Sequence, residues 1–508
     1  MQTEHWEFLK NQSENVPLLI TTALGTIAAG FAIHFARRTV TIQRGEPPLF
    51  PGALPLLGHV IRYGKDANKV YQEASEWSKD KAPVSLSLAG KRLYVILSQK
   101  DVLAVWRAKT LAFDSVCEWG MVSLFGMTAH GAKQMHDDPD GKGDMYVNQH
   151  RFWRDALGPG EDLNLITHRF LEYLEVNIEE FEKTLPKDNS GVEVDLFTWT
   201  RDRIGISATN AIAGPNLLKL DPKIMEKLTK WESEFFLLAL GLPRWALKGP
   251  RENLEDMIKT WMKLGVSPDM LPPLIERTHL VIAREASDWD VAASNLSLWL
   301  GTQANANPSA FWVIYQILLL PADMRARVEA EIAPAFDPAT NRLTDLNHLI
   351  NNTPLLTSIY WEVLRLTAGS ASVREVEEDT MIGGYRFCKG AMVMIPLRLQ
   401  HLNEDVFGDD VDTFVPDRFL RNASELEGNK KNPGIKVLKP FGGGTSLCPG
   451  RHFAINEIFA YVATVLRKFD MELPPGQEVA GLRTSVPSVG TLPPDRDVRV
   501  RVRMRKYE

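Results

Sequence analysis

Cysteine is scarce in this chain of 508 residues, which contains Cys117, Cys388 and Cys448. An odd number of widely spaced cysteines argues against a disulfide framework and favours a reducing compartment. No two of them form a CxxC motif, and none has the histidine spacing of a zinc site. The cysteine content therefore excludes a small protein held together by disulfides or by structural zinc.

Strong charge of either sign is also missing. The chain has 58 Lys and Arg residues against 64 Asp and Glu residues, for a net charge of −6. No basic patch is dense enough to bind nucleic acid, and no glycine-rich dinucleotide fingerprint is present. Internal repeats, low-complexity segments and linkers after residue 60 are absent as well. We therefore expect one large domain over residues 57–508.

One long apolar stretch is present near the N-terminus, from Pro17 to Ala36, and Arg37 and Arg38 follow it directly. About 20 such residues can cross a bilayer as a helix, and the arginines place the bulk of the chain on the cytoplasmic side. The pattern predicts a lumenal segment over residues 1–16 and a membrane anchor over residues 17–36. A cleaved signal peptide is the alternative, although its apolar region would be shorter. The proline-rich residues 37–56 predict a stiff hinge.

Helical patterns dominate the rest of the chain. Apolar residues at helical spacing predict helices over residues 163–185, 223–240, 253–264, 289–320, 356–366 and 451–469. Short β-rich segments joined by glycine predict hairpins at residues 84–95 and 381–396, and strict alternation predicts a strand over residues 498–505. The predicted fold class is mainly α with small β-sheets.

A glycine-rich turn carries Cys448. The sequence Phe-Gly-Gly-Gly-Thr-Ser-Leu-Cys-Pro-Gly-Arg runs from Phe441 to Arg451, at the start of a predicted helix. Glycines let the backbone pass close to a flat cofactor, and N–H groups of the turn and of the helix start can stabilise a thiolate. The turn predicts a cysteine that binds a metal, with a buried and inert cysteine as the alternative.

Two charged motifs precede this turn. Glu362 and Arg365 lie three residues apart on a predicted helix and can pair. Arg418, in the sequence Pro-Asp-Arg-Phe, can complete a Glu–Arg–Arg network with them. An exposed Glu–Arg pair would contribute little to stability. If buried together, the three charges would lock the cysteine loop, and removal of one would leave an unpaired buried charge.

The order ExxR, PxRF and FxxGxxxCxG resembles the signature of the cytochromes P450, whose haem iron is held by a cysteine thiolate. With the anchor, the hinge and the long central helix, the resemblance covers nearly the whole chain. It implies the cytochrome P450 fold and haem b, with Cys448 as the axial iron ligand. Phe441, Gly444 and Gly450 would then lie close to the haem. The Glu–Arg–Arg network would be structural.

The resemblance also suggests contacts to the haem propionates. Arg374 lies where the family places a propionate-binding arginine, and a surface arginine is the alternative. His401 fits a position that is often near a propionate, and a structural histidine fits equally well. Arg154 would add a further contact, although the usual W-x-x-x-R spacing is absent. Many members have a propionate-binding arginine where this chain has Ser446, which makes Arg374 more important.

The central helix departs from the family pattern A/G-G-x-D/E-T-T. The matching residues 303–308 are Gln-Ala-Asn-Ala-Asn-Pro, without the acid and the threonines. Pro308 removes the hydrogen bond to the Ala304 carbonyl, which predicts a kink and a carbonyl free to hold water or a substrate hydroxyl. The amides of Asn305 and Asn307 can exchange hydrogen bonds but cannot titrate. These residues are the candidate catalytic groups, unless the asparagines cap backbone groups at a kink.

The Asn/Pro helix and Ser446 make the chain similar to the branch of cholesterol 7-alpha-hydroxylase, oxysterol hydroxylase and prostacyclin synthase. The resemblance implies a membrane-anchored monooxygenase that oxidises a bulky sterol-like or terpenoid-like molecule with dioxygen. Electrons would come from NADPH through a separate cytochrome P450 reductase. The protein would cross the endoplasmic reticulum membrane once, with its catalytic domain in the cytoplasm. Trp119, Phe125 and Val489 would line the substrate pocket.

Two other functions stay open. The branch also includes an oxygen-independent isomerase, so a reductase-independent isomerase or dehydratase of a lipid endoperoxide or hydroperoxide fits the altered central helix. A haem protein that binds a lipid without catalysis is the third possibility. The cysteine loop alone does not separate these functions.

Overall fold

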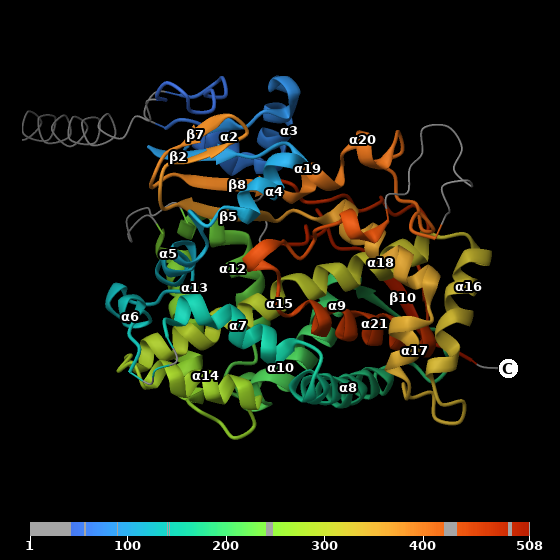
Figure 1. Cartoon of the computed structure of the whole chain (residues 1–508). Helices are drawn as coiled ribbons and strands as arrows, with labels where there is room; N and C mark the ends of the chain where they lie inside the picture. Colours follow the sequence, from blue (N-terminus) through green and yellow to red (C-terminus); the bar gives the residue numbers. More distant parts are fainter. Residues whose placement is uncertain are drawn as a thin grey trace, which may run out of the picture.

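The computed structural model describes residues 42–54, 57–88, 90–139, 141, 143–239, 247–420, 434–485 and 490–506. The predicted lumenal segment, the anchor over 17–36 and the first part of the hinge lie outside these residues. Among the helices that the structure describes, none combines the length and the apolar character needed to span a bilayer. The described part is mainly helical with small sheets, as predicted (Figure 1).

The described helices fall, in chain order, into three consecutive groups. The first group contains α2 (Val60–Lys65), α3 (Ala67–Trp77), α4 (Gln99–Arg107), α5 (Asp114–Ser123), α6 (Ala129–Gln134) and α7 (Met145–Leu157). The second contains α8 (Glu161–Glu182), α9 (Leu196–Thr200), α10 (Ile206–Ala213), α11 (Asn216–Leu220), α12 (Ile224–Ala239), α13 (Lys248–Leu264) and α14 (Pro272–Ile282). The third contains α15 (Asp288–Leu319), α16 (Ala322–Ile332), α17 (Leu346–Asn351), α18 (Pro354–Thr367), α19 (Leu397–His401), α20 (Glu404–Phe407) and α21 (Arg451–Lys468).

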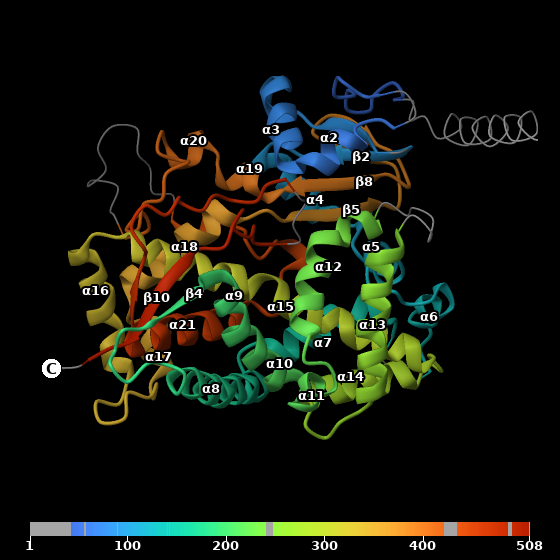
Figure 2. The same ribbon diagram turned by 180° about the vertical axis from the view of Figure 1, so that it is seen from behind.

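The strands in the described part of the chain form three sheets. The five-stranded sheet has the order β1 (Val84–Leu88), β2 (Lys91–Val95), β8 (Met392–Pro396), β5 (Ala371–Val376), β3 (Leu111–Ala112). The three-stranded sheet has the order β4 (Val192–Asp195), β10 (Arg499–Met504), β9 (Phe469–Glu472), and β6 (Thr380–Ile382) pairs with β7 (Tyr385–Phe387). Figures 1 and 2 show the five-stranded sheet with α2, α3 and α4 at one end of the molecule, and the long helices below it.

The hairpin predictions were confirmed in one case and corrected in the other. β1 and β2 pair antiparallel, with Val84 opposite Val95. In the segment 381–396, the antiparallel hairpin is β6–β7, whereas β8 leaves it and pairs parallel with β2 and antiparallel with β5. The glycine pair that was expected to join one hairpin therefore turns only the first half of the segment. The second half carries the chain into the main sheet.

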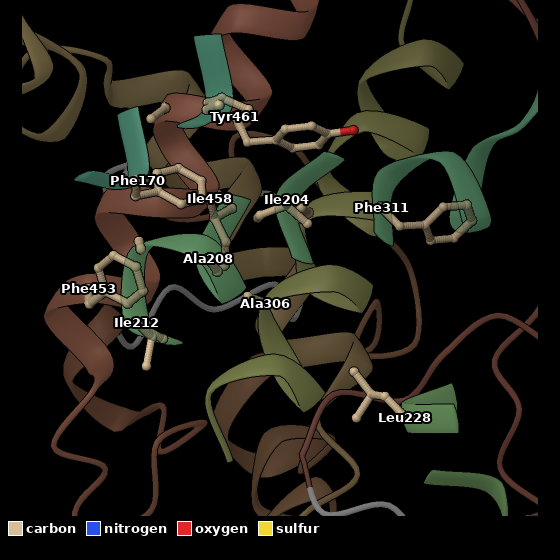
Figure 3. Close-up of a cluster of buried hydrophobic side chains, with 14 of the residues drawn as sticks. Phe170, Ile204, Ala208, Ile212, Leu228, Ala306, Phe311, Phe453, Ile458 and Tyr461 are labelled. Carbon is tan, nitrogen blue, oxygen red and sulfur yellow. The ribbon is translucent and has the colours of Figure 1, made fainter. Parts of the chain in front are cut away.

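Helix α15 runs through the centre of the molecule. Its N-cap is Ser287, whose side chain accepts a hydrogen bond from the Asp290 N–H, as short polar residues do at helix starts. The helix continues through Pro308, so the proline does not end it. Side chains from α8, α10, α15 and α21 converge on one buried apolar cluster (Figure 3). This packing fixes the position of α15 relative to the start of α21, where the cysteine loop ends.

The C-terminal arginines belong to a solvated strand face. Arg501 pairs with Glu193 on β4 at 2.8 Å, and Arg503 pairs with Glu472 on β9 at 2.6 Å. The alternating valines of β10 are buried. The strand predicted over residues 498–505 is confirmed, and these two arginines form ion pairs with neighbouring strands.

Candidate functional site

The cysteine loop is a tight turn whose shape depends on glycine. The Cys448 N–H donates to the Phe441 carbonyl at 2.9 Å, which closes the turn. Gly442 and Gly444 have φ values of +77° and +64°, which residues with a side chain rarely adopt. A Cβ at Gly443 would lie 2.6 Å from the ring of Trp106. The glycines thus permit both the turn and the close approach of a tryptophan.

This contact corrects the expectation for Gly444. A Cβ there would also meet Trp106, at 3.2 Å, and Gly444 is not among the residues that line the cavity beside the loop. Gly442 and Gly450 do line that cavity. Part of the glycine run is therefore required for packing against α4 rather than for access to a cofactor.

Cys448 opens into a cavity of about 2010 Å³. The cavity wall is mostly apolar and includes residues of α5, α12, α15, α18, α21 and the five-stranded sheet. Phe441 and Gly450 line it next to the cysteine. The predicted pocket residues Trp119 and Phe125 line it as well, and Phe125 stacks on Trp231 with ring centroids 5.7 Å apart. Val489 lies outside the described residues.

The surroundings of the Cys448 sulfur suit a ligand of a cation. Burial raises the pKa of the thiol, while hydrogen bonds from the Gly450 and Arg451 backbone and the Arg451 charge lower it. The Nη1 of Arg451 also donates to the Cys448 carbonyl at 3.0 Å. A free thiolate would be disfavoured by the burial, whereas a bound metal ion deprotonates a coordinating thiol. Burial alone thus favours the neutral thiol, and the Gly450 and Arg451 groups would stabilise the thiolate once a metal ion is bound.

Arg374 and Ser446 are direct partners. The Nη2 of Arg374 donates to the Ser446 Oγ at 2.6 Å, and its Nη1 donates to the Val373 carbonyl at 2.7 Å. Both Arg374 and Ser446 line the cavity. Ser446, which stands where many cytochromes P450 have an arginine, thus holds the side chain of Arg374. Arg374 is buried, which contradicts the surface alternative.

Arg154 does not lie where it was expected. Its side chain is 59% exposed, pairs with Asp155 at 2.9 Å and is absent from the cavity wall. The cations near the cysteine loop are instead Arg374 and Arg451. With Arg154, they lower the pKa of His150, in addition to the larger effect of burial. Arg451 was missed because the loop motif assigns no role to the position after its last glycine.

His401 has a structural role. It is fully buried, does not line the cavity, and its Nε2 accepts the Lys439 N–H at 2.9 Å. Burial and nearby Arg365 lower its pKa to about 3, so the ring is neutral. The histidine therefore lies off the cavity wall, where its imidazole supports the backbone just before Phe441.

Glu362, Arg365 and Arg418 form a buried network. The Nε of Arg365 and the Nε of Arg418 lie 2.8 Å and 3.0 Å from the Glu362 carboxylate oxygens. Arg365 also donates to the carbonyls of His401 and Val411. The network holds the segment 401–418 against α18, and the link to the cysteine loop runs through His401. The three charges are buried together, as the expected lock on the loop requires, and they reach the loop through His401 and the Lys439 N–H.

One face of α15 lines the cavity. The residues on this face are Ser297, Leu298, Gly301, Thr302, Asn305, Ala306 and Ser309. The spacing of three and four residues is that of a single helix face. Of the three candidate catalytic residues, Asn305 lies on this face, whereas Ala304 and Asn307 are buried and are not among the lining residues. The match of sequence patterns had placed all three together without regard to helix phase.

The turn at residues 490–492 docks on α15. The Oδ1 of Asn305 accepts the Thr491 N–H at 2.9 Å, and the Ser309 and Thr491 hydroxyls are 2.9 Å apart. Trp312 donates its indole N–H to the Leu492 carbonyl at 2.8 Å. Asn305, Ser309 and Trp312 lie at helical intervals on α15. Their shared role could not be predicted from the sequence, because it depends on the position of the 490–492 turn.

Gly490 is required by this docking. A Cβ there would lie 1.5 Å from the Asn305 Oδ1, so Gly490→Ala should destabilise the protein by roughly 1–3 kcal/mol. In an Asn305→Ala background the colliding amide is gone, and the same change should cost much less. Urea unfolding of the four variants of this double-mutant cycle measures the coupling. Gly249→Ala, where a Cβ has no neighbour within 4 Å, is the control. Equal costs in both backgrounds would contradict the contact.

The cavity suits a haem better than a bare metal ion. Among the described residues, no group of three or more His, Cys, Asp or Glu could hold a metal ion. An iron bound to Cys448 would therefore need its other ligands from a macrocycle. The volume exceeds that of ordinary ligand pockets, about 300–1,000 Å³. Arg374 lies at the wall to meet a propionate, so cysteine, cation and volume fit the group.

Comparisons with known proteins point to the same family as the sequence motifs. Residues 274–499 match the family model described as Cytochrome P450. The chain is 26% identical over 485 residues to "Cytochrome P450 monooxygenase nodJ" of Hypoxylon pulicicidum, with 91% of each chain covered. It is 25% identical over 498 residues to "Cytochrome P450 7A1" of Sus scrofa, covering 91% of this chain and 94% of the relative. The structure described as "Retinoic acid bound cyanobacterial CYP120A1" has a TM-score of 0.67 and 18% identity, covering 92% of this chain and all of that one.

Proposed function

We propose that this chain, whose residues 274–499 match the Cytochrome P450 family model, is a haem-thiolate monooxygenase that oxidises a bulky, lipophilic molecule of sterol or terpenoid type. The observation that carries the proposal is the opening of Cys448 into a large, mostly apolar cavity lined by α15. Relatives named cytochrome P450 monooxygenase and cholesterol 7-alpha-monooxygenase support the reaction and the substrate class.

Membrane attachment and electron supply belong to the same proposal. The apolar stretch from Pro17 to Ala36 would anchor the protein in the endoplasmic reticulum membrane, with the catalytic domain in the cytoplasm. The sequence offers no dinucleotide fingerprint of its own. Electrons from NADPH would therefore arrive through a separate cytochrome P450 reductase.

The residues of the cysteine loop and of β5 hold the cofactor. When bound, a haem with a thiolate ligand supplies the activation of dioxygen and the transfer of one oxygen atom to a substrate C–H bond. Cys448 would hold the iron, and Arg374, whose guanidinium is held by Ser446, would meet a propionate. Trp106 supports the glycine run from the other side. Each of these side chains would bind or orient the haem and would not itself react.

The apolar wall binds and orients the substrate. Trp119, Leu124 and Phe125 come from α5 and the segment after it, and Phe235 and Phe236 come from α12. Burial of a lipophilic molecule against such side chains contributes about 25 cal/mol per Å² of apolar surface. The same wall excludes water, so the hydroxyls on α15 face a site of low polarity.

Hydroxyl groups would handle protons in place of a carboxylic acid. Ser309 and Thr491 both line the cavity, and their oxygens are 2.9 Å apart, with either able to donate. Thr302 lines the cavity one turn before Ala306. We assign the Ser309–Thr491 pair as the group that passes a proton from water toward the substrate side of the cavity. Asn305 holds the 490–492 turn so that Thr491 keeps this position.

A reductase-independent isomerase or dehydratase is the second candidate. The specific observation in its favour is the cavity face of α15, which has no titratable side chain among its residues. A rearrangement of an endoperoxide or hydroperoxide needs no external electrons and less proton delivery. The two functions differ in their need for NADPH.

A binding screen followed by turnover assays tests the proposal. Sterols, terpenoids and lipid hydroperoxides are titrated into the haem-loaded protein, and binding is measured from haem difference spectra. Compounds that bind are then incubated with and without NADPH and reductase. The proposal predicts products from a sterol or terpenoid that require both. Product from a hydroperoxide without NADPH would favour the isomerase, and binding without any product would favour a lipid sensor.

A further inference from the structure

A buried arginine lines the cavity away from the cysteine loop. Arg277 lies on α14 and is 4% exposed. Leu271 and Leu274 of the same segment line the cavity beside it, together with Ile212 of α10 and Leu298 of α15. A guanidinium group therefore stands at an apolar part of the wall.

The protein gives this guanidinium little compensation. Its hydrogen bond is from Nη1 to the Ser294 carbonyl, at 3.4 Å, which is at the long limit of such bonds. Its Nε is buried without a partner, and so is the nearby Ser294 Oγ. Within the described part of the chain, no carboxylate forms an ion pair with Arg277. Glu375 and Glu457, the carboxylates of the cavity wall, are not its hydrogen-bond partners.

The other cations of the cavity wall differ from Arg277. Arg92 pairs with Glu46 at 3.1 Å, and Arg374 binds Ser446. Lys91 and Lys389 are exposed to solvent. Arg277 thus combines burial with the lack of an acidic partner among the described residues.

A charge in this position calls for an anion. Removing an ion from water without a partner costs several kcal/mol. Burial lowers the pKa of Arg277 to about 10, so the group stays protonated at neutral pH. A carboxylate can accept two hydrogen bonds from one guanidinium. An acidic ligand in the cavity would supply the missing acceptors.

We infer that Arg277 anchors the carboxylate of an acidic lipophilic substrate, such as a terpenoid or sterol acid. The inference rests on the proposed function, because it gives the substrate of that cavity a charged end. Arg277 bonds to Ser294, and Asn305 and Ala306 lie farther along the cavity face of α15. At a rise of 1.5 Å per residue, this separation is roughly 16–18 Å along the helix. The oxidised carbon would lie at about this distance from the acid.

Matched acids and esters test the anchor. Abietic acid and methyl abietate, and lithocholic acid and its methyl ester, are titrated into the haem-loaded protein, and dissociation constants come from difference spectra. We expect at least one acid to bind roughly 10–150-fold more tightly than its ester, the range for hydrogen bonds to a charged group. Arg277→Met should remove this preference and change ester binding less than about threefold. Arg277→Lys should retain part of it.

Lys91→Met is the control, because it removes an exposed cation from the same cavity wall and should leave the preference intact. Equal binding of acids and esters by the unaltered protein would overturn the anchor, as would an unchanged preference in Arg277→Met. If Arg277→Met does not load haem, Arg277→Lys and the unaltered protein decide. Failure of the proposed function is measured separately, because product would then form without NADPH or not at all, whether or not the acids bind more tightly than their esters.

Discussion

Cys448→Ser is expected to abolish thiolate ligation. The ferrous carbon monoxide complex of the unaltered protein should show the long-wavelength Soret band that is typical of a haem-thiolate protein. The serine variant should lose this band and all reductase-dependent turnover, because a hydroxyl oxygen does not replace the sulfur that opens into the cavity. Absorption spectra of the reduced, carbon monoxide-treated proteins make the measurement.

Cys117→Ser is the matched control for this change. Cys117 lines the same cavity, but it lies on α5, and burial raises the pKa of its thiol to about 12. The Cys117→Ser variant should keep the long-wavelength Soret band. If Cys448→Ser retained the band, or if Cys117→Ser lost it, the assignment of the iron ligand to Cys448 would be wrong.

Glu362→Gln is expected to cause the largest loss of stability. Glu362 is fully buried and accepts hydrogen bonds from Arg365, Arg418 and the Val415 N–H. An amide would leave buried Arg365 without a counter-charge and Arg418 with Asp410 alone, 2.8 Å away, which costs roughly 3–5 kcal/mol. It would also turn an N–H₂ group toward other donors. Urea unfolding followed by circular dichroism gives the change in free energy.

An exposed pair of the same types serves as the control for that experiment. Glu193 lies 2.8 Å from Arg501, and the two side chains are 43% and 49% exposed. Glu193→Gln should change the unfolding free energy by less than about 1 kcal/mol. Similar losses in both variants would contradict the view that burial makes the Glu362 network important.

Most of the helices could be predicted from the sequence because their apolar faces pack on one core. The pattern over 289–320 predicted α15, and that over 451–469 predicted α21, each to within one residue at either end. The segment 381–396 was harder, because glycines mark turns but do not say which partner a strand will find. β8 pairs with β2, which lies almost 300 residues earlier.

The sequence predicted the parts of the candidate site whose geometry a local motif fixes. The predictions were wrong where a contact between distant residues decides the position of a side chain. The glycine-rich turn depends on its own dihedral angles, so the sequence was enough to place Cys448 in a tight loop. The role of His401 depends on the Lys439 N–H, and the exposure of Arg154 depends on how α7 packs. Neither contact leaves a signal in the neighbouring residues.

Helix phase explains the error at the central helix. Pattern matching treated Ala304, Asn305 and Asn307 as one unit, but residues one or two positions apart point in different directions on a helix. The lining set shows that Asn305 faces the cavity. Arg277 gave no sequence signal either, since an arginine on an amphipathic helix is usually solvated.

Incorporation of isotopically labelled dioxygen tests the central claim most directly. The haem-loaded protein, reductase and NADPH are incubated under labelled dioxygen with a sterol or terpenoid that gives a binding spectrum. The molecular mass of the product is then measured by mass spectrometry. A monooxygenase inserts one labelled oxygen atom, and no product forms when NADPH is omitted. A product with no labelled oxygen, formed equally without NADPH or dioxygen, would contradict the account.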